Sequence, residues 1–229
     1  MIILKPKVLV PVSQLENEII RQLERYARVC YKSENLMNKS DPSNFLKSKV
    51  AMGHESIIEH EKATVMFIVD RGISHEIVRH RIAAYSQEST RYCNYSMDKF
   101  GNEITVIEPF FFIENPVYKK WEHACLTAEE DYMAMLDQGC SPQEARSVLP
   151  NSLKTEIVVT FNFREWRHFF KLRCSSAAHP QMRQVAIPLL LLFKDRMPVL
   201  FEDITFDTEF PKEHYAEIIK TDSFFNSLH

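Results

Sequence analysis

The chain of 229 residues is long enough to bury one sizeable hydrophobic core, so we expect a single domain over residues 1–229. Its net charge of −3 gives no general attraction to nucleic acid or to a membrane surface, so any anion must be bound by a local cluster. The five cysteines are odd in number and form no C-x-x-C pair, which argues against a zinc site or disulfide framework and favours a reducing cytoplasm.

The first third of the chain alternates strand and helix signals. A short strand is predicted at 5–12, followed by a helix over about 14–31 that Ser13 is placed to cap. After a polar loop, Asp41-Pro42 opens a second helix that Gly53 closes. The segment 63–69 is apolar on both faces and predicts a buried strand.

Residues 54–60, with the sequence His-Glu-Ser-Ile-Ile-Glu-His, carry two histidines and two glutamates. A zinc-binding H-E-x-x-H helix places its histidines on one face, whereas His54 and His60 are six residues apart and out of phase. We therefore favour a polar loop and expect no metal.

The segment 73–95 concentrates cationic and hydroxyl groups. Arg79-His80-Arg81 is followed after seven residues by Ser89, with Arg91 just beyond. Apolar residues recur here at helical spacing, so we expect the Arg-His-Arg run on a helix beside that stripe (Ile73, Ile77, Ala84). A solvated basic helix is the simpler interpretation, but guanidinium groups beside so many hydroxyls favour an anion site.

The second half predicts further alternation. We expect a strand near 104–107, a core helix beginning at Asn115-Pro116, a short helix from Ser141-Pro142 to Pro150, and a strand at 153–161. A buried helix bent by Pro188 follows at 185–197; its apolar run is too short to span a bilayer. The tail beyond Phe201 shows no pattern. The four glycines form neither G-x-G-x-x-G nor a P-loop, so side chains would have to contact any dinucleotide.

A helix is predicted over residues 162–173. On a helical wheel Arg173 shares the face of Asn162, Trp166 and Phe170, while the opposite face is basic (Arg164, Arg167, His168, Lys171). An arginine in phase with Trp and Phe either extends to solvent or enters a polar pocket.

These motifs resemble those of the flavin-dependent thymidylate synthases. Arg79-His80-Arg81, seven residues and Ser89 resembles the signature of that family, and residues 54–60 resemble its second characteristic stretch. Arg146-Ser147-Val148-Leu149-Pro150 and Phe170-Lys171-Leu172-Arg173 resemble two further segments. The chain departs from the family pattern at four places (Glu76, Ser86-Gln87, Gln143-Glu144 and His179-Pro180-Gln181).

The resemblance implies a fold and a reaction. The fold is α+β, a single domain with a central, mostly antiparallel sheet flanked by helices, assembled as a homotetramer with sites made by several subunits. The reaction is reductive methylation of dUMP to dTMP, with 5,10-methylene-tetrahydrofolate as carbon donor and FAD and NADPH as reductants. No nucleic acid and no membrane partner are implied.

The resemblance also assigns residues. Arg173 is expected to be catalytic, through a hydrogen bond to the uracil ring that stabilises negative charge. The remaining residues expected to bind dUMP are Glu76, Arg79, Gln87, Glu88, Ser89, Thr90, Arg91 and Arg146. Those expected to bind FAD are His54, Ser56, Glu59, Arg79, His80, Arg81, Gln87, Asn162, Arg164 and His168.

Nucleophilic catalysis is not indicated. Ser89 lacks a base that the sequence places within reach, so we interpret it as a donor to the nucleotide. Nothing marks Cys93 or Cys174 as an activated thiol. The alternative function is a non-catalytic nucleotide- or RNA-binding module whose arginines hold phosphate, although the net charge argues against RNA.

Overall fold

The computed structural model describes residues 1–37, 39, 41–97 and 100–224. Their contacts form two compact units, each assembled from three stretches of chain. The first unit comprises Met1–Lys7, Phe67–Arg79 and Ser86–Ile157, and the second comprises Val8–Met66, His80–Tyr85 and Val158–His229. Because four strands run from one unit into the other, the prediction of a single domain stays a prediction.

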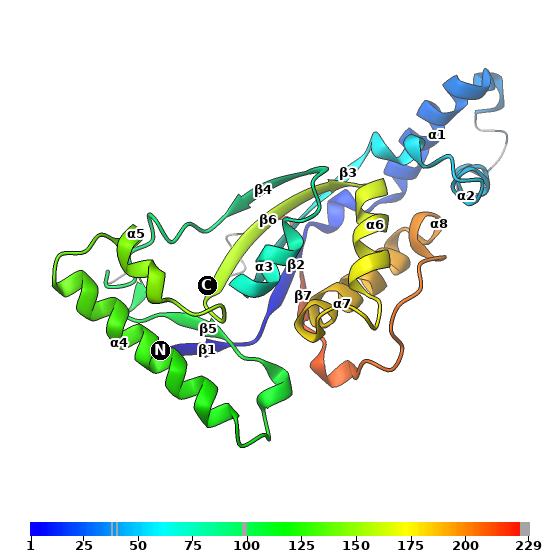
Figure 1. The fold of residues 1–229 in the computed structure, drawn as a ribbon. Helices are drawn as coiled ribbons and strands as arrows, with labels where there is room; N and C mark the ends of the chain where they lie inside the picture. The colour runs from blue at the N-terminus through cyan, green and yellow to red at the C-terminus, as the bar shows by residue number, and fades with distance from the viewer. Residues whose placement is uncertain (38, 40, 98–99, 225–229) are drawn as a thin grey trace. The chain divides into compact units, whose positions relative to one another are not determined.

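A five-stranded sheet forms the centre of the second unit. Its order is β4 (Ala83–Gln87), β6 (Lys154–Asn162), β3 (Lys62–Asp70), β2 (Lys7–Val10) and β7 (Glu217–Lys220). Figure 1 shows β6 between β4 and β3. The Thr64 and Thr160 hydroxyls lie 2.9 Å apart. Farther along the same pair of strands, the Arg71 amide donates to the Leu153 carbonyl at 3.0 Å. Residue numbers therefore rise on β3 as they fall on β6, and the predicted mostly antiparallel sheet is confirmed.

The helices of the second unit are α1 (Asn17–Tyr31), α2 (Pro42–Ala51), α6 (Phe163–Arg173), α7 (Pro180–Arg196) and α8 (Pro198–Phe201). The first four follow the sequence predictions with shifted ends, whereas the short α8 was not predicted. The expected cap of the first helix is wrong: the Ser13 hydroxyl donates to Asp222 Oδ1 at 2.7 Å, and Ser13 belongs to a separate 3-10 turn. Asp41 caps α2 as predicted by accepting from the Ser43 amide.

Aromatic rings hold α6 to the sheet and to α7. Trp166 packs 4.7 Å from Phe161 of β6 and 5.2 Å from Phe193 of α7, measured between ring centroids. Its indole nitrogen donates to the Ala63 carbonyl of β3, so this buried ring leaves no donor unsatisfied. These contacts fix α6 on the sheet. Its buried residues lie between Phe163 and Phe170, and they include charged as well as aromatic side chains.

The C-terminal elements extend beyond what the sequence indicated. The helix α7 begins five residues earlier than predicted because the His179 ring caps it and Pro180 occupies its first turn, while Pro188 lies inside it as expected. The tail contributes β7 at the sheet edge, where the Thr221 amide donates to the Val10 carbonyl. Four residues, of which the middle two are half-buried and the outer two exposed, were too short a pattern to reveal this strand.

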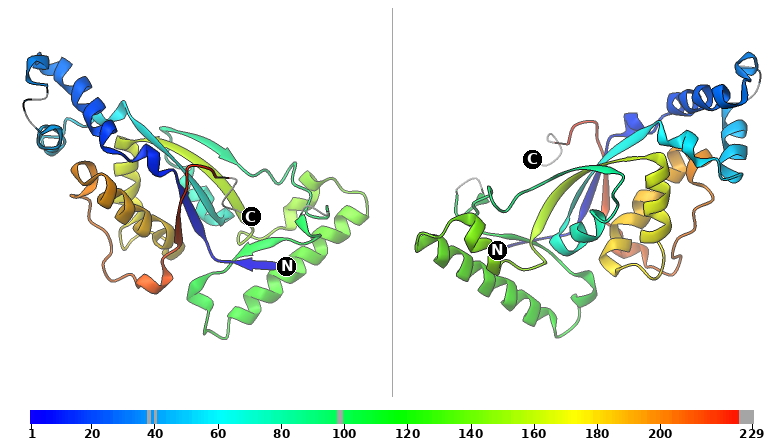
Figure 2. Two further views of the ribbon diagram at one scale, coloured as in Figure 1. Left: turned by 180° about the vertical axis from the view of Figure 1, so that it is seen from behind. Right: turned by 45° about the horizontal axis from the view of Figure 1, so that its top comes forward.

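The first unit contains a two-stranded parallel sheet of β1 (Ile2–Leu4) and β5 (Thr105–Ile107). Its helices are α3 (Arg71–Ile77), α4 (Tyr118–Asp137) and α5 (Pro142–Ala145). The predicted apolar stripe of α4 faces a hydrophobic core: Cys125 and Tyr132 are buried in it, and Trp121 and Leu136 pack against the same cluster. The element α4 runs as one long helix in both views of Figure 2, where it is green. No helix in the described part of the chain combines the length and apolar character that crossing a bilayer requires.

Candidate functional site

The Arg-His-Arg segment does not lie on a helix, contrary to the prediction. The helix α3 ends at Ile77, and after a turn the chain enters β4 at Ala83. The spacing of Ile73 and Ile77 is helical, but beyond them the backbone pairs with β6, where the Glu88 amide donates to the Glu156 carbonyl at 2.9 Å. Sheet pairing thus overrides local periodicity, and three neighbouring side chains receive different environments.

Of these three side chains only the histidine is buried. Arg79 and Arg81 are exposed, and Arg79 belongs to the first unit. His80 is 4% exposed and belongs to the second unit. The segment is therefore a turn that presents two guanidinium groups to solvent and buries one imidazole.

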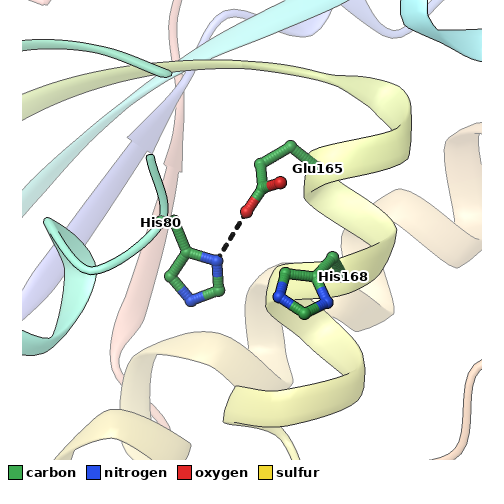
Figure 3. A group of neighbouring side chains, drawn as sticks. All are labelled: His80, Glu165 and His168. Atoms are coloured by element: carbon green, nitrogen blue, oxygen red, sulfur yellow. Dashed lines mark hydrogen bonds and ion pairs between the residues drawn. The ribbon is translucent and has the colours of Figure 1, made fainter. Parts of the chain in front are cut away.

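The buried imidazole connects two charged residues of α6. His80 Nδ1 lies 2.7 Å from Glu165 Oε1 (Figure 3), and His80 Nε2 accepts from Arg173 Nε at 3.2 Å. Glu165 is itself 7% exposed, whereas Arg173 is half-buried. The result is a continuous hydrogen-bonded chain from a carboxylate through an imidazole to a guanidinium.

Burial keeps this imidazole neutral. Loss of water lowers the pKa of His80, and the nearby Arg173 and His168 lower it further, against the opposing effect of Glu165. A neutral ring has one donor and one acceptor nitrogen, which is what a carboxylate on one side and an arginine on the other require. The electrostatic and geometric observations agree on an uncharged ring.

His80, Glu165 and His168 also place three potential metal-ligand atoms within 4.8 Å of one another. A cation bound there would have to displace a hydrogen bond of His80 and lie beside the Arg173 guanidinium. We therefore assign no metal to this group. The segment 54–60, where the sequence raised the metal question, contains a 3-10 helix (Glu55–Glu59) with exposed histidines at either side.

A cavity of about 380 Å³ lies in the second unit, beside the hydrogen-bonded series Glu165–His80–Arg173. It is lined by Glu55, Glu59, Ile82, Asn162, Arg164, Glu165, His168 and Lys171. Four residues that the resemblance assigned to FAD are thus brought together: Glu59, Asn162, Arg164 and His168. Arg164 pairs with Glu59, and Lys171 Nζ lies 3.6 Å from Glu55 Oε1, so cations and carboxylates alternate around the cavity.

The local structure explains why Asn162 and Glu165 lie here. The Asn162 side chain accepts from the Glu165 amide at 2.8 Å and caps α6, an interaction typical of Asn at this position. A carboxylate in the first turn is stabilised by the positive end of the helix dipole. Of the other residues assigned to FAD, His54, Ser56 and Arg81 are exposed within the same unit, and Gln87 belongs to the first unit.

Arg167 corrects the helical-wheel prediction. The wheel placed it on a basic face, yet it is 2% exposed. Its two terminal nitrogens each donate to an Asp203 carboxylate oxygen at 2.7 Å, and its Nε donates to Glu55 at 3.1 Å. The guanidinium lowers the pKa of Asp203. Arg167 therefore forms buried ion pairs, because residues distant in sequence supply its carboxylate partners.

The residues assigned to dUMP lie in the first unit, apart from Arg173. Thr90 Oγ1 accepts from Arg146 Nη1 at 3.3 Å, which joins two of the predicted segments. The Arg91 amide donates to Ser89 Oγ at 3.3 Å, while the Arg91 guanidinium is exposed near the Tyr92 ring. Glu76 is half-buried at the end of α3.

Gln87 and Glu88 contact residues that the sequence gave no reason to select. The Gln87 amide donates to the hydroxyls of Ser74 and Thr155 at 2.9 and 3.1 Å. Glu88 Oε2 lies 3.0 Å from the Lys154 ammonium nitrogen, and Glu88 Oε1 accepts from the Tyr95 hydroxyl at 3.1 Å. A second cavity, of about 350 Å³, lies beside Glu88, Tyr95 and Lys154. Half-buried and buried side chains alternate along β6, and this pattern places the Lys154 side chain here. The pattern does not indicate what chemical role that side chain has.

The structure argues against a thiolate at Cys174. This residue is fully buried, and burial raises the pKa of its thiol. Cys93 is half-buried.

Comparison with known proteins agrees with the sequence resemblance. Residues 14–199 match the family model described as "Thymidylate synthase complementing protein". A protein of Geobacter sulfurreducens named "Flavin-dependent thymidylate synthase" is 37% identical over 184 residues, covering 77% of this chain and 78% of that protein. Proteins with the same name from Corynebacterium aurimucosum and Mycobacterium avium are 34% and 32% identical over 205 and 207 residues, each covering 81% of this chain and 80% of the relative.

Proposed function

Because the chain belongs to the flavin-dependent thymidylate synthase family, we propose that it methylates dUMP with 5,10-methylene-tetrahydrofolate as carbon donor and NADPH as reductant. It is an enzyme, a methyltransferase that makes dTMP in a flavin-dependent reaction. The alternative of a non-catalytic nucleotide- or RNA-binding module receives no support from the relatives.

The cavity in the second unit fits part of a flavin dinucleotide. Its volume lies at the lower end of the range of about 300–1,000 Å³ that small-molecule sites occupy. Arg164 and Lys171 supply cations suited to a diphosphate, and Asn162 and His168 supply polar groups for the remainder. Bound FAD, once reduced by NADPH, would supply the hydride that completes the methyl group. The residues present thus suit the cofactor, which would extend beyond this cavity.

Arg173 is proposed to polarise the uracil. The observation that carries this role is its Nε–H bond to His80, which anchors a half-buried guanidinium at the end of α6. A fixed cation in a site shielded from water stabilises negative charge that develops on the ring nitrogen N3 and its flanking carbonyls. The planar fork can donate twice, to N3 and O2, as a point charge cannot.

Phosphate binding is proposed for arginines of the first unit. Arg146 is connected to Thr90, and Arg79 and Arg91 are exposed, so their guanidinium groups reach solvent where a nucleotide phosphate would approach. Ser89 would donate to the nucleotide, and Glu76, Gln87 and Glu88 would complete the contacts. Each charge-assisted hydrogen bond to phosphate contributes roughly 1.5–3 kcal/mol.

The role of Arg173 is tested by changing it to Ala and to Lys. Because the guanidinium acts on charge that grows along the reaction, dTMP formation should fall by roughly 100-fold or more while dUMP affinity changes little. Lysine should restore little activity. Oxidation of NADPH with oxygen as acceptor should continue, since it needs no activated pyrimidine. Near-parental dTMP formation in either variant would remove Arg173 from this role.

The assembly is proposed to be a homotetramer whose subunits complete one another's sites. Exposed guanidinium groups and a cavity that fits only part of the cofactor suit sites completed by a neighbouring subunit. Sedimentation equilibrium should give about four times the chain mass of 26.9 kDa. A monomer that binds flavin with full affinity would contradict this proposal.

A further inference from the structure

Three residues of α6 follow one another at intervals of four. Glu165, Phe169 and Arg173 form this stripe, and successive members lie one helical turn apart on the same side. The His80 ring packs on the middle member, with its centroid 5.1 Å from that of Phe169. It therefore reaches the carboxylate one turn before and the guanidinium one turn after.

The chemistry of the two ends fixes the proton on the imidazole. An arginine Nε only donates, so His80 Nε2 must offer its lone pair. A carboxylate accepts, so the ring proton lies on Nδ1 and points at Glu165. The titratable groups around this ring are Glu165, Arg173 and His168, whose ring lies edge-on at 5.4 Å. The bond to Nε also fixes the plane of the guanidinium.

We propose that Glu165 and His80 are positioning residues: Glu165 holds His80 in the Nδ1–H tautomer, and His80 orients Arg173 toward the pyrimidine. This inference rests on the proposed role of Arg173 and extends it to two residues for which no contact with the pyrimidine is proposed. His80, which the sequence resemblance assigned to FAD, acts here through Arg173. Glu165 carried no assignment at all.

The first test is Glu165→Gln, an almost isosteric change. The amide NH₂ of glutamine can donate to His80 Nδ1, which would move the ring proton to Nε2. The Nε2–H group would then face the Nε–H group of Arg173, and two donors would oppose each other. Imidazole ¹⁵N shifts, assigned with His80→Gln, should report Nδ1–H in the parent and Nε2–H in the variant. We expect dTMP formation to fall roughly 10- to 100-fold, with dUMP affinity and flavin content near parental values.

A double variant separates positioning from an independent role. Once Arg173 is Ala, adding Glu165→Gln should lower dTMP formation no further, because the orientation of an absent side chain has no effect. If the double variant lowered dTMP formation by the product of the two single-variant factors, the proposal would be overturned. The matched control is Glu24→Gln, which removes an equally buried carboxylate from its pair with Arg28 on α1 and should leave turnover per folded enzyme unchanged.

Two variants at the histidine keep the test decisive if Glu165→Gln does not fold. His80→Gln places an amide oxygen near the position of Nε2, whereas His80→Phe keeps the ring shape and removes the acceptor. Glutamine should retain severalfold more dTMP formation than phenylalanine, with equal flavin content; equal activities would overturn the proposal. A parental rate in Arg173→Ala would defeat the proposed role of Arg173 itself, while a slow Arg173→Ala beside a parental Glu165→Gln would defeat only the positioning role.

Discussion

The two units use arginine in different ways. In the second unit Arg167 is buried with carboxylates on both sides, and Arg173 is anchored by a buried histidine. In the first unit Arg79 and Arg91 extend from turns and are exposed. In the second unit, protein groups already surround and orient the guanidinium before any ligand binds. An exposed guanidinium is surrounded by water instead, and loses that water only when an anion replaces it.

This contrast separates two tasks of a transferase. Stabilising charge that develops during a reaction requires groups that are fixed in advance, and the second unit contains them. Holding a phosphate requires only that cations can reach it, and exposed arginines are sufficient. The contrast predicts that substitutions of the buried or anchored arginines in the second unit affect stability or turnover, while those of the exposed arginines in the first unit affect affinity.

The largest expected effect on stability is at Arg167. Arg167→Met removes a buried guanidinium and leaves Glu55 and Asp203 without their principal cation, so the free energy of unfolding should fall by about 3 kcal/mol. Chemical denaturation of the purified protein measures this change. The matched control is Arg164→Met, three residues earlier and half exposed, which should change stability by less than about 0.5 kcal/mol. Equal effects at the two positions would remove the distinction between buried and exposed cations.

A smaller effect is expected on ligand affinity in the first unit. Arg91→Ala or Arg146→Ala should weaken dUMP binding by roughly 10-fold, the equivalent of one lost charge-assisted hydrogen bond, and leave FAD bound. Calorimetric titration with dUMP and with uridine provides the control, because uridine lacks the phosphate and should bind parent and variant alike. Variants that prefer dUMP over uridine as strongly as the parent does would show that the phosphate lies elsewhere.

The smallest expected effect is a pH dependence at Asp203. The Arg167 guanidinium lowers the pKa of this carboxyl below its ordinary 3.8, so the ionised form is stabilised in the folded state. The contribution is complete above pH 3.8 and is lost as the pH falls through the lower, folded-state pKa. Parent and Asp203→Asn should therefore differ in unfolding midpoint at pH 6 and converge in strong acid. A difference that grows on acidification would contradict the direction of this shift.

Sequence periodicity predicted the elements whose contacts are local. The strand β6 and the helix α6 were placed within a residue of their ends because alternation and the Asn162 cap are encoded in consecutive positions. The Arg-His-Arg run was misplaced on a helix because pairing of β4 with β6 depends on residues some seventy positions away. Tertiary partners decided that outcome, and no local window contains them.

The candidate site residues divide in the same way, into those that the sequence identified and those that only tertiary contacts reveal. The resemblance selected Asn162, Arg164 and His168, and the structure brings them to one cavity. It gave no role to Glu165, and the wheel assigned Arg167 to a basic face, because a charged side chain in a helix looks solvated until its partner is known. Burial of a titratable group is a property of the assembled fold rather than of its neighbours in sequence.

The interleaving of the two units has a genetic consequence. Each unit draws on three separate stretches of chain, and the stretches alternate from the N-terminus onward. Neither unit therefore corresponds to an uninterrupted reading frame that recombination could transfer to another gene. A premature stop at any codon between 67 and 157 removes parts of both units, so a truncated chain retains neither unit intact.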